Sequence, residues 1–133
     1  MIDSQLKALV QLRARETSES ATARKLPNGS SLITIPRVDI GSGWNQKEVT
    51  VLFVAPPGYP AARPDCFWVE PTGLRLESGA TPQASNDSNP IPGDDNPARK
   101  TTWFSWHLET WSPNTDSLVT FFNAIMVRLR PAR

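Results

Sequence analysis

The stretch that decides the fold is PPGYPAARPDCFWV, residues 56–69. Its four prolines predict a turn, because proline fixes its own φ angle and has no N–H to donate to a strand ladder. Residues 66–69 then predict a short aromatic strand. Before the turn, residues 48–54 are apolar on both alternating faces, which is typical of a strand in the middle of a sheet. We therefore expect a proline-rich turn between two strands.

The part of the chain before residue 48 predicts a helix and a hairpin. Asp3 or Ser4 is the expected cap of a helix that runs to about residue 15 and carries an apolar stripe. The Asn-Gly pair at residues 28–29 is the strongest hairpin signal in the chain, since both residue types accept the positive φ of a tight turn. The strand after it, residues 32–35, is expected to end at Pro36.

The part after residue 69 predicts a long loop and a final helix. Residues 77–100 hold four prolines, two glycines and no periodicity, so we expect an irregular loop that is either functional or mobile. Residues 101–108 are aromatic and are expected to be extended. Apolar residues at helical spacing then indicate a helix, with Asn114 or Thr115 as its expected cap. These apolar residues are Leu118, Phe121, Phe122, Ile125, Met126 and Leu129.

Helix, strands, irregular loop and helix in this order predict the α+β class. We expect one domain over residues 1–133, with an N-terminal helix, an antiparallel meander sheet, a long irregular loop and a C-terminal helix packed on the sheet.

Composition narrows the classes of function. The net charge of +1 gives no strong attraction to nucleic acid or to a membrane, so neither is expected as a partner. A single cysteine, Cys66, argues against an internal disulfide and against a cysteine-based zinc site. A single histidine, His107, argues against the usual multi-histidine metal sites, and no motif indicates an organic cofactor. The polar start and the lack of a long apolar run predict a soluble cytoplasmic protein.

Several motifs occur together in an order that resembles one known family. They are Pro56-Pro57-Gly58-Tyr59-Pro60, Pro64-Asp65-Cys66-Phe67-Trp68-Val69, Leu74-Arg75-Leu76, Phe104-Ser105-Trp106-His107 and Trp111-Ser112-Pro113 with Asp116. From about residue 51 onward the chain resembles a bacterial ubiquitin-conjugating-enzyme-like family, the branch encoded with ubiquitin-like proteins and lacking the usual catalytic cysteine. The resemblance implies a ubiquitin-conjugating (UBC)-like fold. It also implies two partners, a ubiquitin-like protein and a ubiquitin-activating-like enzyme that consumes the ATP.

The reactive cysteine of the parent family has no counterpart at its usual place. That place is shortly before the Trp-x-Pro step, and residues 100–111 contain no cysteine. Cys66 lies in the strand after the turn, and we interpret it as a small buried apolar side chain. The Asn that supports the reactive cysteine in the parent family is also missing. The chain therefore needs another nucleophile if it catalyses the transfer itself.

Ser105 and His107 are the predicted catalytic residues. A serine can hold an acyl group as an oxyester if a base takes its proton. Residues two apart share one face of an extended segment but point about 200° apart on a helix, so the pair works only if the segment is extended or looped. A chance Ser-x-His pair and a structural histidine are the alternatives. Thr101 and Thr102 are alternative hydroxyls.

Partner contacts are predicted at both ends of the chain. Lys7, Arg13 and Arg15 of the first helix match, by the resemblance, the basic residues that dock the activating enzyme, although a charged helix face is often only solvated. Trp103 and Trp106 are expected near the C-terminal tail of the ubiquitin-like protein, while other tryptophans pack under the helix.

Three functions therefore stay open. The first is a transferase that carries a ubiquitin-like protein as a Ser105 oxyester. The second is a catalytically inactive UBC-like scaffold that binds the ubiquitin-like protein or its activating enzyme. The third is an unrelated α+β interaction domain. A hydrolase with a complete Ser-His-acid triad is less favoured, since the chain has no Gly-x-Ser-x-Gly elbow.

Overall fold

The computed structural model describes residues 2–15, 17 and 19–133 and has two helices and six strands in the described part of the chain. In chain order these elements are α1 (Ile2–Arg13), β1 (Thr22–Lys25), β2 (Ser31–Asp39), β3 (Glu48–Ala55), β4 (Phe67–Glu70), β5 (Ser85–Asn86), β6 (Thr102–Phe104) and α2 (Leu118–Leu129). The strands form one antiparallel sheet in the order β1-β2-β3-β4-β6-β5. This confirms the predicted α+β class and is consistent with a UBC-like fold.

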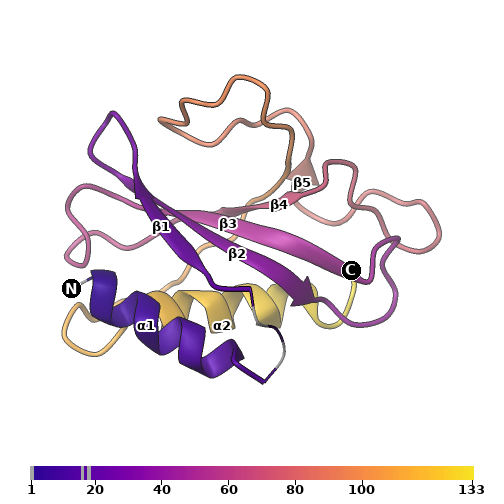
Figure 1. Ribbon diagram of the computed structural model, residues 1–133. Coiled ribbons are helices and arrows are strands. Elements are labelled where there is room, and N and C mark those ends of the chain that lie inside the picture. The colour runs from indigo at the N-terminus through magenta and orange to yellow at the C-terminus, as the bar shows by residue number, and fades with distance from the viewer. Residues whose placement is uncertain (1, 16, 18) are drawn as a thin grey trace.

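Both helices cover the same face of the sheet (Figure 1). Alternate strand residues point to that face, as the period of two in a strand requires. Val51 and Phe53 of β3 and Phe67 of β4 are fully buried there, and Phe53 packs on Phe121 of α2 with ring centroids 4.9 Å apart. Leu118 and Ile125 of α2 complete the same cluster. The helix therefore packs on the sheet through the apolar stripe that its spacing predicted.

The opposite face of the sheet carries a second, smaller core. Leu52 of β3 and Trp68 of β4 point to this side, where Cys66 also packs. The long loop drawn in orange in Figure 1 crosses this face and contributes Ile91, which is 4 % exposed. Because β3 is buried on both faces, its sequence is apolar on both faces, which predicted a central strand. The structure confirms this, since β3 pairs with β2 on one side and with β4 on the other.

Two local expectations were wrong. β2 does not end at Pro36 but runs to Asp39 through a bulge, where the pairing shifts between Ile35 and Val38 and Arg37 has a φ of 53°. Proline is tolerated there because a bulge leaves a residue outside the hydrogen-bond ladder. The sheet is also not a pure meander, since the short β5 pairs on the outer side of β6.

The predicted helix caps were wrong as well. α1 begins at Ile2, so Asp3 and Ser4 lie inside its first turn. The N-cap of α2 is Ser117, whose hydroxyl accepts the Val119 N–H at 3.2 Å, rather than Asn114 or Thr115. Neither helix of the described residues is long and apolar enough to cross a membrane.

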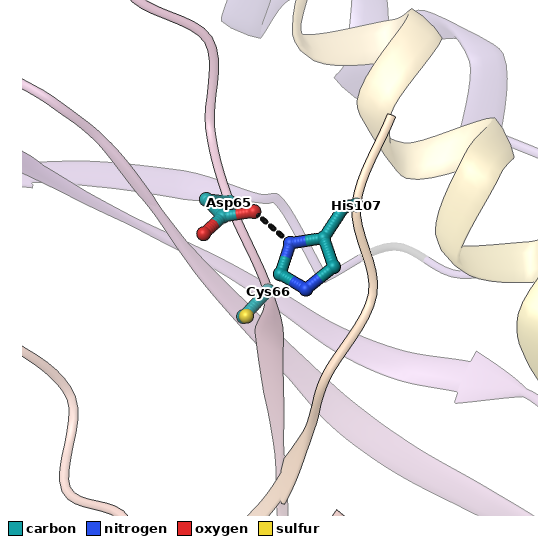
Figure 2. Close-up of side chains that lie close together, drawn as sticks. All are labelled: Asp65, Cys66 and His107. Carbon is teal, nitrogen blue, oxygen red and sulfur yellow. Dashed lines mark hydrogen bonds and ion pairs between the residues drawn. The ribbon is translucent and has the colours of Figure 1, made fainter. Parts of the chain in front are cut away.

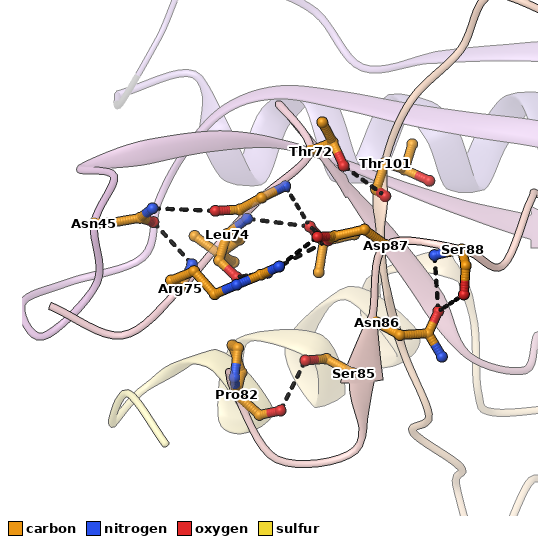
Figure 3. A network of polar contacts seen from close by, with 12 residues as sticks. Asn45, Thr72, Leu74, Arg75, Pro82, Ser85, Asn86, Asp87, Ser88 and Thr101 are labelled. Carbon is orange, nitrogen blue, oxygen red and sulfur yellow. Dashed lines mark hydrogen bonds and ion pairs between the residues drawn. The ribbon is translucent and has the colours of Figure 1, made fainter. Parts of the chain in front are cut away.

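A polar network fixes the long loop to the sheet (Figure 3). Asp87 accepts a hydrogen bond from the Thr102 hydroxyl at 2.6 Å and pairs with Arg75 at 2.5 Å. The Thr102 oxygen in turn accepts the backbone N–H groups of Gly73 and Leu74, at 2.9 and 3.1 Å. The loop therefore has a defined conformation although it contains almost no regular structure.

Candidate functional site

The site forms where the chain enters β4 and leaves β6. These strands are antiparallel, with Phe67 opposite Phe104, so the residues just before β4 lie beside those just after β6. The Cys66 N–H donates to the Trp106 carbonyl at 2.9 Å and extends the pairing beyond the strands. Cys66 itself adopts a φ of 62°, in the left-handed region that few non-glycine residues occupy. Strand register thus brings together two segments about 40 residues apart.

Ser105, His107 and Asp65 form a continuous hydrogen-bonded chain. The Ser105 Oγ lies 3.2 Å from His107 Nε2. His107 Nδ1 contacts Asp65 Oδ1, as Figure 2 shows. A carboxylate that accepts the Nδ1 proton leaves the lone pair of Nε2 facing the serine hydroxyl. Ser105 and His107 therefore meet in a looped segment, which is the geometry that the sequence argument required.

Asp65 is the member that sequence reasoning missed. It stands in the proline-rich stretch that decides the fold, but nothing local links it to a histidine 42 positions later. The sequence signal was its position directly before the predicted aromatic strand, and that signal has meaning only once the pairing of β4 with β6 is known. Serine, histidine and acid thus lie in hydrogen-bonded order in a chain that has no Gly-x-Ser-x-Gly elbow.

The histidine and the acid are open to water. The side chain of His107 is 56 % exposed and that of Asp65 is 60 % exposed, while Ser105 is half-buried. A contact this exposed contributes little to stability, since water competes with it and screens it. Its role is therefore not to hold the fold together. The imidazole and the carboxylate are therefore accessible from solvent.

Cys66 lies beside this chain but is buried, as its interpretation as a packing residue requires. It is 8 % exposed, and burial is the main cause that raises the pKa of its thiol above the ordinary value. A thiol of this kind is a poor nucleophile, because the thiolate is the reactive form. Its sulfur nevertheless lies near the side chains of Asp65 and His107, and the three ligand atoms are within 4.8 Å of one another.

A cavity of about 400 Å³ adjoins Asp65 on the face of the sheet opposite the helices. Its walls are largely apolar and include Trp68 and Trp103, and Arg63 also lines it. Trp103 therefore lines this cavity, and its contact with a C-terminal tail stays a prediction. Trp106 is held differently, since its indole N–H donates to the Ala124 carbonyl of α2 at 3.0 Å. It anchors the segment that carries His107.

The other predicted residues fall into exposed and buried groups. Lys7 and Arg15 are exposed on or just after α1, but Arg13 is only 3 % exposed. The Arg13 guanidinium donates to the Arg37 carbonyl at 2.7 Å and lies over the Phe122 ring, so Arg13 is not part of an exposed basic face.

The alternative hydroxyls are not available either. Thr101 and Thr102 are 7 % and 0 % exposed, and the Thr102 hydroxyl is engaged by Asp87. Burial of this kind keeps both hydroxyls away from a partner's acyl group. Ser105 is therefore the hydroxyl of this segment that adjoins an imidazole.

Comparison with known proteins gives one match. A protein-family model described as Prokaryotic E2 family E covers residues 15–132, which include Asp65, Ser105 and His107. No curated protein and no solved structure matches the chain. The matched segment begins after α1, so the residues of that helix lie outside it.

Proposed function

This chain belongs to the prokaryotic E2 family E, and from that premise we propose that it accepts a ubiquitin-like protein on Ser105 as an oxyester and passes it to an acceptor. Membership in an E2-like family implies, in general, interaction with a ubiquitin-like protein and its activating enzyme. The observation that carries the proposal is the hydrogen-bonded chain from Ser105 through His107 to Asp65.

The first half-reaction is an acyl transfer from the activating enzyme. The Ser105 Oγ attacks the thioester carbonyl carbon of the ubiquitin-like protein while His107 Nε2 takes the hydroxyl proton. The C–S bond breaks, and the departing thiolate takes up the proton that His107 holds. Asp65 keeps the imidazole oriented and stabilises its charge while it is protonated. The product is an oxyester on Ser105 and a free thiol on the activating enzyme.

The second half-reaction reverses these roles. An acceptor amine attacks the oxyester carbonyl and loses a proton to His107 as the new C–N bond forms. The C–Oγ bond then breaks, and His107 returns a proton to Ser105. A general base in such a step contributes about 10²–10⁴-fold to the rate, which is the size of effect assigned to His107.

The proposal is tested by incubating the protein with the ubiquitin-like protein, its activating enzyme and ATP. We expect an adduct that resists thiol reductant, is cleaved by hydroxylamine or base, and is absent in Ser105→Ala. His107→Ala should slow its formation by about 10²-fold or more, because the hydroxyl then loses its base. Asp65→Asn should slow it less than His107→Ala. Gel shift and mass spectrometry measure the adduct.

Matched variants make the result decisive. Ser105→Cys should form an adduct that reductant cleaves, because the linkage becomes a thioester. Ser112→Ala, at an exposed serine outside the hydrogen-bonded chain, should load like the unchanged protein. An adduct that survives Ser105→Ala would place the nucleophile elsewhere, and an adduct lost in Cys66→Ala would assign it to the thiol.

A non-catalytic scaffold is the second candidate function. It is favoured by the exposure of His107 and Asp65, since water competes with their hydrogen bond and weakens the base. In that case no adduct forms, while the protein binds the ubiquitin-like protein or the activating enzyme with the same Kd before and after Ser105→Ala.

A further inference from the structure

Three different metal-ligand types meet at the entrance to β4. Asp65 supplies a carboxylate oxygen, Cys66 a sulfur and His107 an imidazole nitrogen, and these atoms lie within 4.8 Å of one another (Figure 2). Oxygen, sulfur and nitrogen ligands together are the donor set that Zn²⁺ prefers. Sites with three protein ligands typically leave a fourth, open position for water or another ligand.

We propose that Asp65, Cys66 and His107 bind a Zn²⁺ ion and that the bound ion switches off acyl transfer on Ser105. The proposal that zinc binds depends only on the positions of the three side chains. Only the inhibition rests on the proposed function of Ser105. The two parts can therefore be tested separately.

The required geometry is within reach of these side chains. Ligand atoms around a tetrahedral zinc ion lie about 3.3–3.8 Å apart, given metal–ligand distances of about 2.0–2.3 Å. The donors must therefore move by about 1.5 Å at most, relative to the 4.8 Å limit. Asp65 and His107 are more than half exposed, so both can rotate toward an ion without disturbing the core.

The backbone beneath the site is already fixed. The Cys66 N–H donates to the Trp106 carbonyl, which joins the residues next to Asp65 and next to His107 at 2.9 Å. The Trp106 indole is held in turn by the Ala124 carbonyl of α2. The ion therefore orders only side chains, which lowers the entropic cost of binding.

Zinc binding through either imidazole nitrogen of His107 has the same effect on Ser105. If Nε2 binds the ion, its lone pair is no longer available to the Ser105 hydroxyl. If Nδ1 binds the ion, the neutral ring carries its proton on Nε2, which then cannot accept the proton of Ser105. In both cases Asp65 also turns from the histidine to the metal. Zinc therefore removes the base from the serine while leaving the serine itself in place.

Metal binding is tested with Co²⁺ as a spectroscopic probe that Zn²⁺ should displace. The unchanged protein should show a thiolate-to-cobalt charge-transfer band that saturates at one ion per chain and disappears on addition of Zn²⁺. Ser105→Ala should keep the band. Cys66→Ala should lose it, and its zinc affinity should fall by more than the roughly 10- to 100-fold that loss of an outer partner costs. His107→Ala, at an exposed position, serves as a second ligand variant.

Inhibition is tested in the loading reaction with Zn²⁺ and then with a chelator. Zinc should slow adduct formation on the unchanged protein by about 10²-fold or more, the value of a lost general base, and the chelator should restore it. Cys66→Ala should load at the same rate with and without Zn²⁺, which also controls for any effect on the activating enzyme.

The outcomes separate the two proposals. Absence of the charge-transfer band, or its persistence in Cys66→Ala, overturns the zinc site whatever the loading assay gives. Equal inhibition of Cys66→Ala and the unchanged protein overturns the switch. If no adduct forms in any protein but the band depends on Cys66, the proposed function of Ser105 fails and the zinc site stands.

Discussion

Tyr59 connects three segments of the chain through the side-chain amide of Gln5. Its hydroxyl donates to Gln5 Oε1 of α1, and the same oxygen accepts the Leu118 N–H at 3.1 Å. The Tyr59 ring also packs on Trp111, with centroids 6.0 Å apart. Burial of its ring raises the pKa of Tyr59 to about 12.

Tyr59 is the only tyrosine in the chain, so phenolate absorbance reports it alone. We expect a titration midpoint near pH 12 in the folded protein and near the ordinary value of 10.0 after denaturation. The folded state holds the proton more tightly, so the stability due to this group is complete below about pH 10 and is lost toward pH 12. Tyr59→Phe should remove the signal, and a folded-state midpoint near 10 would contradict the burial argument.

At the scale of elements, α2 positions the site as well as filling the core. Its Ala124 carbonyl holds Trp106, and its Arg128 donates to the Gln83 carbonyl at 2.7 Å. The Arg128 guanidinium also lies 4.8 Å from the centre of the Phe104 ring, directly before Ser105. Ser105 is fixed on its other side by the Ala84 carbonyl, which accepts its N–H at 2.8 Å. The stability of α2 therefore affects the placement of the serine.

Ser117→Ala should destabilise the protein by about 1 kcal/mol, the usual cost of losing an N-cap side chain. The Ser117 hydroxyl accepts the Val119 N–H, and the Thr120 hydroxyl accepts the Ser117 N–H to complete a capping box. Urea unfolding measures the change. Asn114→Ala, at an exposed position outside the box, is the matched control and should have little effect. Equal losses in both variants would argue against Ser117 as the cap.

At the scale of the whole molecule, the long loop and the sheet are joined by Asp87. Thr102 is fully buried, so removal of its acceptor leaves a buried hydroxyl without that partner. Hydrogen bonds from Arg75 are the main cause that holds the pKa of Asp87 below the ordinary range. This contribution to stability is therefore present above about pH 4 and is lost as the pH falls further.

Asp87→Ala should cost about 1–3 kcal/mol, the penalty for an unsatisfied buried polar group. It should also speed proteolytic cleavage within residues 77–100, because the loop loses its connection to β6 and to Arg75. Denaturant unfolding and limited proteolysis measure the two effects. Asp95→Ala, on the same loop, breaks an exposed pair with Arg24 and should change neither by much.

Parts of this organisation were accessible to sequence reasoning because they depend on local spacing. Helical spacing from Leu118 onward predicted α2, and two-sided apolarity predicted that β3 is central. The prediction that β2 ends at Pro36 was wrong because of a bulge. A bulge is defined by pairing with the neighbouring strand, and the sequence of one strand does not show that pairing. Arg13 was misplaced for a similar reason, since the Arg37 carbonyl that receives it comes from β2.

The sequence by itself determined the fold class, the proline-rich turn and the pair Ser105 and His107, because each follows from residues that are close along the chain. Only the tertiary structure decided that Asp65 and Cys66 stand beside that histidine. The physical reason is register, since the pairing of Phe67 with Phe104 sets which residues before β4 face those after β6. A shift of one residue in this pairing would exchange the side chains on the two faces and separate the acid from the histidine.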